Sequence, residues 1–309
     1  MNQLYVEVLC RCLRHDRTER GSERPYAAGA GRRRLRMSGP RLLAVGAHAA
    51  DAFLAAGGTL AKHSAAGNEI TIACLSYGER SHAPGFWQPR SGEHRPVSIE
   101  EIRQCKKEEA ERAAAILGAE ISFLNFGECP LEIDATRMRH LVELVRKLKP
   151  SAIVTHWTQD WTNPDHAIAG QALLEACHYA AIPGFETSLN GQGSPPFATG
   201  QIYHYAINPI CLAPELGLTP DYYVDISSFL DTKTAALKAF TTQDSIERDI
   251  QAFAEHVAYT IGYRCHTRYA EAFMTMPHPP RPHQYLWTGE SDRDRNPSGS
   301  PKEPTHDVS

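Results

Sequence analysis

Residues 41–66 have the sequence RLLAVGAHAADAFLAAGGTLAKHSAA, in which a short apolar run leads through a turn into a segment of helical composition. The run Arg41–Gly46 is almost continuously apolar, as expected for a strand that is buried on both faces of a sheet. Half of the residues from Asp51 to Ala66 are Ala or Leu, which favours a helix. The stretch therefore predicts a strand, a turn and a helix, the repeating unit of a parallel sheet covered by helices.

The same alternation continues along the chain. Strands are predicted at 69–75, 120–126 and 151–156, and near 202–205 and 223–226; helices are predicted at 99–117, 135–148 and 165–181, with two more after residue 200. Gly118 is suited to end the helix before it, and Pro150 stops the next one. We therefore expect one α/β domain with a mostly parallel sheet and helices on both faces, without an internal repeat or linker.

The two ends of the chain differ from the middle. Residues 1–36 are rich in Arg and lack apolar periodicity, and Met37 stands just before the first predicted strand. No apolar stretch follows these charges, so a secretory signal is not expected, and the interspersed acidic residues argue against an organellar presequence. We expect 1–36 to be a disordered leader or a mis-called start, 37–289 to be the catalytic domain, and the polar segment 290–309 to be a disordered tail.

Composition excludes several classes of partner. A net charge of -4 offers no electrostatic basis for binding nucleic acid. No apolar run approaches the roughly 18–20 residues that span a bilayer. The eight cysteines are scattered and form no CxxC pair, which indicates reduced thiols and a cytoplasmic protein.

Histidine and aspartate gather after two of the predicted strands, where open parallel sheets bind their ligands. His48 and Asp51 follow the first strand; after the strand at 151–156, Pro164 favours a helix start that places His166 in the first turn. Two nitrogens and one carboxylate, with a fourth position open, are typical of a catalytic zinc, which lowers the pKa of bound water to about 7. The alternative is that both histidines only cap helices.

Three motifs carry a resemblance to a known family. The turn around His48 with Gly57-Gly58-Thr59, the segment Asn163–His166 and the segment Arg268–Phe273 resemble the AHPDD/GGT, HPDH and RYAEAF motifs of the PIG-L/LmbE family. The resemblance covers about 41–273. It implies a Rossmann-like sheet, Zn²⁺ as cofactor, removal of N-acetyl groups from amino sugars, and zinc ligands at His48, Asp51 and His166.

Two positions depart from the deacetylase pattern. Ala50 stands where the family has its general-base aspartate, and Asn163 stands where it has a histidine that stabilises the oxyanion or acts as an acid. Alanine cannot accept a proton and asparagine cannot act as a general acid, and such losses cost about 10²–10⁴-fold in rate. Ordinary amide hydrolysis is therefore not favoured.

The segment Cys74–Arg80 (CLSYGER), together with these departures, resembles the 4-oxalomesaconate hydratase branch of the family. That resemblance implies Glu79 as the base. Arg80 is suited to pair with a substrate carboxylate, against the alternative of an exposed, salt-bridged loop. A histidine after the strand near 202–205 is also implied as the acid; the candidates are His204 and, if the alignment shifts, Asn208.

Other residues carry open alternatives. Asn163 and Arg268 are candidate substrate contacts, although Arg268 also fits an ordinary surface charge, and His156 and Asp160 could orient His166. A long loop holds further candidates, either as a lid or as exposed loop residues: His82, Trp87, Arg90, His94 and Arg95. His278 and His283 lie among prolines, either in a tail or in an arm that reaches a neighbouring subunit of a homo-oligomer.

The sequence thus predicts a zinc-dependent hydratase that adds water to a small, anionic, unsaturated oxo-carboxylic acid, as in aromatic catabolism. The first alternative is a zinc-dependent N-acyl hydrolase acting on a polar N-acetyl sugar. The second is an inactive scaffold that binds a metal ion, since two catalytic positions of the family are replaced.

Overall fold

The computed structural model describes residues 39–87, 98–187, 193–207, 219–243 and 252–275, all within the compact unit Ser38–Ser309. The predicted leader 1–36 and tail 290–309 lie outside the described residues, as do Arg90, His94, Arg95, Asn208, His278 and His283.

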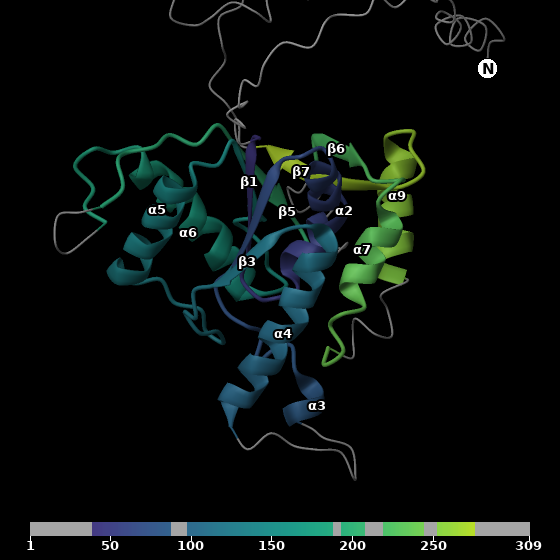
Figure 1. The fold of residues 1–309 in the computed structure, drawn as a ribbon, viewed down its shortest axis with the longest axis horizontal. Coiled ribbons are helices and arrows are strands. Elements are labelled where there is room, and N and C mark those ends of the chain that lie inside the picture. Colours follow the sequence, from purple (N-terminus) through teal and green to yellow (C-terminus); the bar gives the residue numbers. More distant parts are fainter. Residues whose placement is uncertain (1–38, 88–97, 188–192, 208–218, 244–251, 276–309) are drawn as a thin grey trace, which may run out of the picture. The chain divides into compact units, whose positions relative to one another are not determined.

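Within the described residues, seven strands form a sheet in the order β3-β2-β1-β4-β5-β7-β6 (Figure 1). Their bounds are β1 Arg41–Gly46, β2 Glu69–Cys74, β3 Glu120–Phe123, β4 Ala152–His156, β5 Gln201–Tyr205, β6 Tyr222–Asp225 and β7 Ala270–Thr275. The first five strands in this order are parallel to one another, whereas β7 runs antiparallel to both β5 and β6. The carboxyl ends of β1, β2, β3 and β4 therefore lie along one edge.

Helices cover both faces of the sheet (Figure 1). One core packs α2 (Asp51–Ala65), α4 (Ile99–Leu117) and α7 (Leu230–Leu237) against the sheet, and α9 (Ala258–Arg264) packs against β7 on the same side. A second core packs α5 (Ala135–Leu148) and α6 (Pro164–Ala180) against the other face. Two short segments complete the elements: α3 (Pro84–Trp87) and a π-helical turn, η3 (Ala252–Val257).

Local sequence signals explain the helix ends. Ser98 and Glu101 form a reciprocal capping box at the start of α4, and Gly118 ends that helix in a left-handed conformation. At the end of β1 the backbone turns sharply: a Cβ on Gly46 would lie 2.8 Å from the carbonyl oxygen of His48. Glycine is thus required where the chain leaves β1 for the turn that carries His48 and Asp51.

The fold class predicted from the sequence is confirmed, and the helices α4 and α5 have the predicted bounds. The strand β7 was not predicted. Its Glu271 is buried because its carboxylate accepts hydrogen bonds from the backbone amides of Gly58 and Thr59 in α2 and pairs with Lys233 at 2.7 Å. A charged residue inside a buried strand interrupts the apolar pattern, so periodicity alone does not reveal this strand.

Candidate metal centre

The turn between β1 and α2 holds two of the three predicted ligands. Asp51 is the first residue of α2, and its Oδ2 accepts a hydrogen bond of 2.7 Å from the backbone amide of His48. The same oxygen lies 3.2 Å from His48 Nδ1. The three-residue offset therefore brings an imidazole nitrogen and a carboxylate oxygen to one point.

The third predicted ligand comes from the start of α6. Asn163 caps this helix by accepting a hydrogen bond from the amide of Asp165, and Pro164 occupies the first turn. This start places His166 Nε2 at 3.7 Å from Asp51 Oδ2, while His166 Nδ1 lies 3.0 Å from Asp160 Oδ2. The ligand atoms of His48, Asp51 and His166 all lie within 4.8 Å of one another.

These three side chains fit a metal ion. All are at least nine-tenths buried, yet His48 Nδ1 and His166 Nε2 have no hydrogen-bond partner. A buried polar atom without a partner costs about 1–3 kcal/mol. A divalent cation between the two nitrogens and the Asp51 carboxylate would satisfy all of them, and this donor set suits zinc with an open coordination position.

The charges around the site are strongly coupled. Burial alone would raise the pKa of Asp51, but His48, His166 and His156 outweigh it and hold that pKa well below its usual value. Burial alone would lower the pKa of His48, but the carboxylates of Asp51, Asp165 and Glu128 together outweigh it, and that pKa is raised well above its usual value. A metal ion at this site would therefore displace a proton from His48.

Two histidines border the ligand set. The ring of His156 stacks on His166 with centroids 4.2 Å apart, and its Nε2 lies 2.9 Å from Asp51 Oδ2. Burial, followed by the charge of His166, lowers the pKa of His156 to about 4. The ring of His82 lies 4.4 Å from that of His48. Both side chains thus line the site, and His156 and Asp160 contact the predicted ligands directly.

Glu128 was not predicted from the sequence. This residue follows β3 and is 5% exposed; its Oε2 lies 3.1 Å from His48 Nε2. Asp165 Oδ2 lies 3.5 Å from the same nitrogen. The only sequence signal for Glu128 was its place after a strand of the same sheet, at the edge where the ligands gather.

Glu79, which follows β2, does not lie with the side chains of His48, Asp51 and His166. It is fully buried; its Oε1 accepts a hydrogen bond of 2.9 Å from Arg103 Nε and forms an ion pair with Arg103 Nη2, also at 2.9 Å. Among the described residues, the groups of ligand atoms within 4.8 Å of one another do not include Glu79. The Arg80 side chain is exposed, and the Trp87 indole donates to the Glu79 carbonyl oxygen.

The remaining predicted site residues lie in different surroundings. Asn163 is half-buried, and its Oδ1 serves the helix cap. His204, on β5, is fully buried and donates from Nδ1 to the carbonyl of His156, while its Nε2 has no partner. Burial lowers its pKa, which disfavours a proton on Nε2 while Nδ1 donates to the carbonyl. Arg268 is exposed, with its guanidinium 5.3 Å from the ring centroid of Tyr269.

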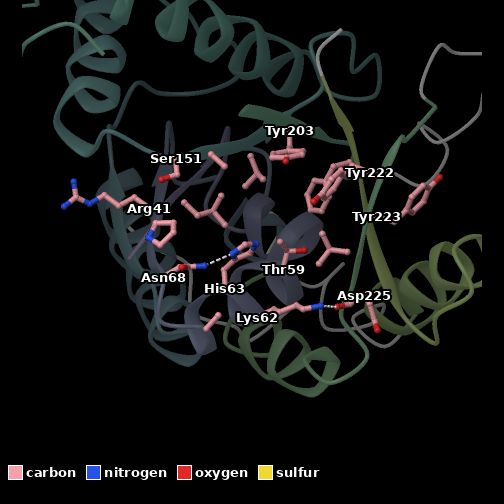
Figure 2. A pocket seen from close by; sticks show the side chains of 17 residues that line it. Arg41, Thr59, Lys62, His63, Asn68, Ser151, Tyr203, Tyr222, Tyr223 and Asp225 are labelled. Carbon is pink, nitrogen blue, oxygen red and sulfur yellow. Dashed lines mark hydrogen bonds between the residues drawn. The ribbon is translucent and has the colours of Figure 1, made fainter. Parts of the chain in front are cut away.

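A cavity of about 580 Å³ lies elsewhere (Figure 2). Residues at the amino ends of β1 and β4 line it, with the second half of α2 and the strands β6 and β7. Figure 2 shows Tyr203 and Tyr222 on one side and Thr59 and Lys62 on α2. None of the predicted ligands lines this cavity, so it is separate from the candidate metal centre.

A mostly parallel sheet, covered by helices and carrying a buried His–Asp–His set at its carboxyl edge, defines the class of this protein: an α/β enzyme with residues able to hold a catalytic metal ion. The sequence model of the PIG-L family, described as GlcNAc-PI de-N-acetylase, matches residues 43–177. The chain belongs to the PIG-L family.

Its relatives include a hydratase and deacetylases. The chain is 32% identical to 4-oxalmesaconate hydratase of Pseudomonas putida over 66% of its own length and 74% of the relative's. It is 25% identical to diacetylchitobiose deacetylase of Thermococcus kodakarensis, over 77% and 83% of the two chains. Among solved structures, GalB, the 4-carboxy-2-hydroxymuconate hydratase from Pseudomonas putida, aligns with a TM-score of 0.67 at 27% identity, over 80% of this chain and all of that one. The described residues contain no helix long and apolar enough to cross a membrane.

Proposed function

We propose that this protein is a zinc-dependent hydratase that adds water to a small, unsaturated oxo-carboxylic acid. One observation carries the choice of reaction. The residue before Asp51 is Ala50, a buried N-cap whose methyl group cannot accept a proton. The hydratase relative, at 32% identity, supports the same choice.

The proposed ligands are His48, Asp51 and His166. Their support is the convergence of two buried nitrogens without partners on one carboxylate oxygen. When bound, a zinc ion supplies a Lewis acid that lowers the pKa of bound water to about 7.

We assign proton transfer to Glu79. Arg103, which holds its carboxylate, also lies 3.5 Å from Glu100 on the same helix. A guanidinium that shifts toward Glu100 would release Glu79 for the reaction. The exposed Arg80 next to it and Arg268 are proposed to bind the carboxylates of the substrate, because guanidinium groups pair with carboxylates in a bidentate geometry. Asn163 is proposed as a further polar contact to the substrate. The addition of water also needs an acid that gives a proton to the substrate, and His204, whose Nε2 has no hydrogen-bond partner in the described structure, is proposed for this role once Nε2 is protonated.

Glu79→Gln tests this proposal. The amide keeps the shape of the side chain but cannot accept a proton, so hydration of an unsaturated oxo-acid should fall by about 10²–10⁴-fold with bound zinc retained. The Michaelis constant should change less, since the arginines hold the substrate. Glu111→Gln, the same change on the exposed face of α4, serves as a control. Near-normal hydration by Glu79→Gln would refute the assignment.

The second candidate is an N-acyl hydrolase, favoured by the family model and the deacetylase relative. Ala50→Asp separates the two functions. In a deacetylase that lacks its base, the new carboxylate should raise hydrolysis of N-acetylglucosamine derivatives. In a hydratase it would add negative charge beside an anionic substrate and lower activity. Robust deacetylation by the unaltered protein would contradict the hydratase proposal.

We place the reaction in the cytoplasm. The described cysteines are free thiols, as expected in a reducing compartment: Cys74, Cys105, Cys129, Cys177 and Cys265. Assembly into a homo-oligomer stays a prediction, which sedimentation equilibrium can test.

A further inference from the structure

The loop after β3 places one carboxylate against a proposed metal ligand. Glu128 Oε2 lies 3.1 Å from His48 Nε2, and on the other side of the ring His48 Nδ1 lies 3.2 Å from Asp51 Oδ2. A carboxylate that accepts the N–H of one imidazole nitrogen leaves the other nitrogen unprotonated and able to bind a metal ion. In the structure His48 Nε2 makes no hydrogen bond, so Glu128 faces it as a charge at 3.1 Å; a small rotation of either side chain would let the carboxylate accept the Nε2–H and set the tautomer of His48.

The same carboxylate holds a second part of the chain. Glu128 Oε1 accepts a hydrogen bond of 2.5 Å from the backbone amide of Arg80, and Oε2 accepts one of 2.5 Å from the hydroxyl of Ser81. Hydrogen bonds to an ionised acceptor are about twice as strong as neutral ones. The segment Glu79–Ser81 is therefore tied through one side chain to His48.

The loop that carries Glu128 is itself anchored to the third ligand. The backbone amides of Cys129 and Leu131 donate to the carboxylate of Asp165, at 3.0 and 2.8 Å. Asp165 directly precedes His166 in the first turn of α6. This anchor fixes Glu128 relative to both histidine ligands.

We infer that Glu128 is a positioning residue that sets the tautomer of His48 and holds the Glu79–Ser81 segment at the same metal centre. The inference rests on the metal centre of the proposed function, and it holds whichever reaction that centre performs. Glu128 acts through other residues, so losing its carboxylate should change metal binding, whereas losing only the Ser81 hydroxyl should loosen the segment.

Two variants separate these roles. In Glu128→Gln the amide oxygen can still accept from Arg80, but the NH₂ group then faces His48 Nε2 and favours the tautomer whose Nδ1 carries the proton. That tautomer cannot bind a metal ion through Nδ1. Ser81→Ala removes the bond between the segment and Glu128, together with the bond from the same hydroxyl to His82 Nδ1, and leaves the contact between Glu128 and His48. Glu132→Gln, an exposed position in the same loop, is the matched control.

The experiment measures metal affinity by chelator competition, the visible spectrum of the Co²⁺-loaded protein, and amide hydrogen exchange of the segment 77–82. Glu128→Gln should weaken metal binding by about 10–100-fold, the usual effect of removing an outer carboxylate, and should alter the cobalt spectrum. Ser81→Ala should keep near-normal affinity and exchange faster in the segment. The control should match the unaltered protein in all three measurements.

Unchanged affinity and spectrum in Glu128→Gln would overturn the inference. So would a second bound cation per chain that Glu128→Gln removes, because Glu128 would then be a ligand. Absence of metal binding in the unaltered protein would overturn both the proposed centre and this inference, whereas absence of hydration with these metal results intact would overturn the hydratase alone. Melting temperatures are compared for every variant, and Glu128→Met repeats the metal measurement if the glutamine variant is unfolded.

Discussion

Asp160→Asn should weaken metal binding by reversing one hydrogen bond. Asp160 Oδ2 accepts from His166 Nδ1 at 3.0 Å, and Oδ1 accepts from the backbone amide and the hydroxyl of Thr162. In the asparagine variant the oxygen keeps the bonds to Thr162, so the NH₂ group faces His166. Two donors then oppose each other unless His166 moves its proton to Nε2, the atom that faces Asp51.

The size of the effect follows from this geometry. A histidine with its proton on Nε2 cannot bind the metal ion through that atom. The variant thus weakens one of three protein ligands while its imidazole ring stays in place. Loss of an outer partner of a ligating histidine typically costs 10–100-fold in metal affinity. Since each factor of ten is worth about 1.4 kcal/mol, the stabilisation that saturating metal gives the fold should fall by about 1.4–2.8 kcal/mol.

Chelator competition measures the affinity, and the melting temperature with and without metal measures the stabilisation. Nitrogen-15 NMR of the histidine rings reports the tautomer of His166 directly. Asp134→Asn is the matched control, because it also removes one carboxylate charge but at the exposed cap of α5. An affinity of Asp160→Asn within twofold of the unaltered protein would refute the reasoning.

Three further outcomes are expected. The unaltered protein should carry close to one zinc per chain by elemental analysis. His48→Ala and His166→Ala should each stay folded but lose this zinc, whereas the exposed His140→Ala should keep it. Equal zinc content in all four proteins would contradict the site. Arg146→Met should lower the free energy of unfolding by about 3–5 kcal/mol in urea titration, because this buried guanidinium donates to five carbonyls around the end of α6. The exposed Arg112→Met should change the free energy of unfolding little. Burial alone would raise the pKa of Asp160, but His166 and Thr162 outweigh it and hold that pKa at about 2. In the metal-free protein the ionised Asp160 therefore stabilises the fold fully above the ordinary carboxyl pKa, and this stabilisation is lost as pH falls toward 2. The difference in the free energy of unfolding between the unaltered protein and Asp160→Asn should close over that range in acid titrations.

Most of the fold could be predicted from local sequence because its elements carry their own signals. The capping box of Ser98 and Glu101 and the left-handed Gly118 mark the ends of α4, and α4 and α5 have the predicted bounds. The strand β7 escaped because Glu271 is buried there by partners on α2 and α7, about 210 and 38 positions away in the chain. The apolar periodicity of a strand does not reveal a buried charge whose partners lie on distant elements.

By itself the sequence determined the β-α alternation and the grouping of His48, Asp51 and His166, because residues that follow parallel strands must meet at one edge of the sheet. Tertiary structure alone decided what surrounds them. Glu128 reaches His48 only because β3 lies two strands from β1 in the sheet, and Glu79 pairs with Arg103 only because α4 passes beside its loop. Such contacts depend on distances between elements far apart in the chain, which no local pattern of residue types encodes.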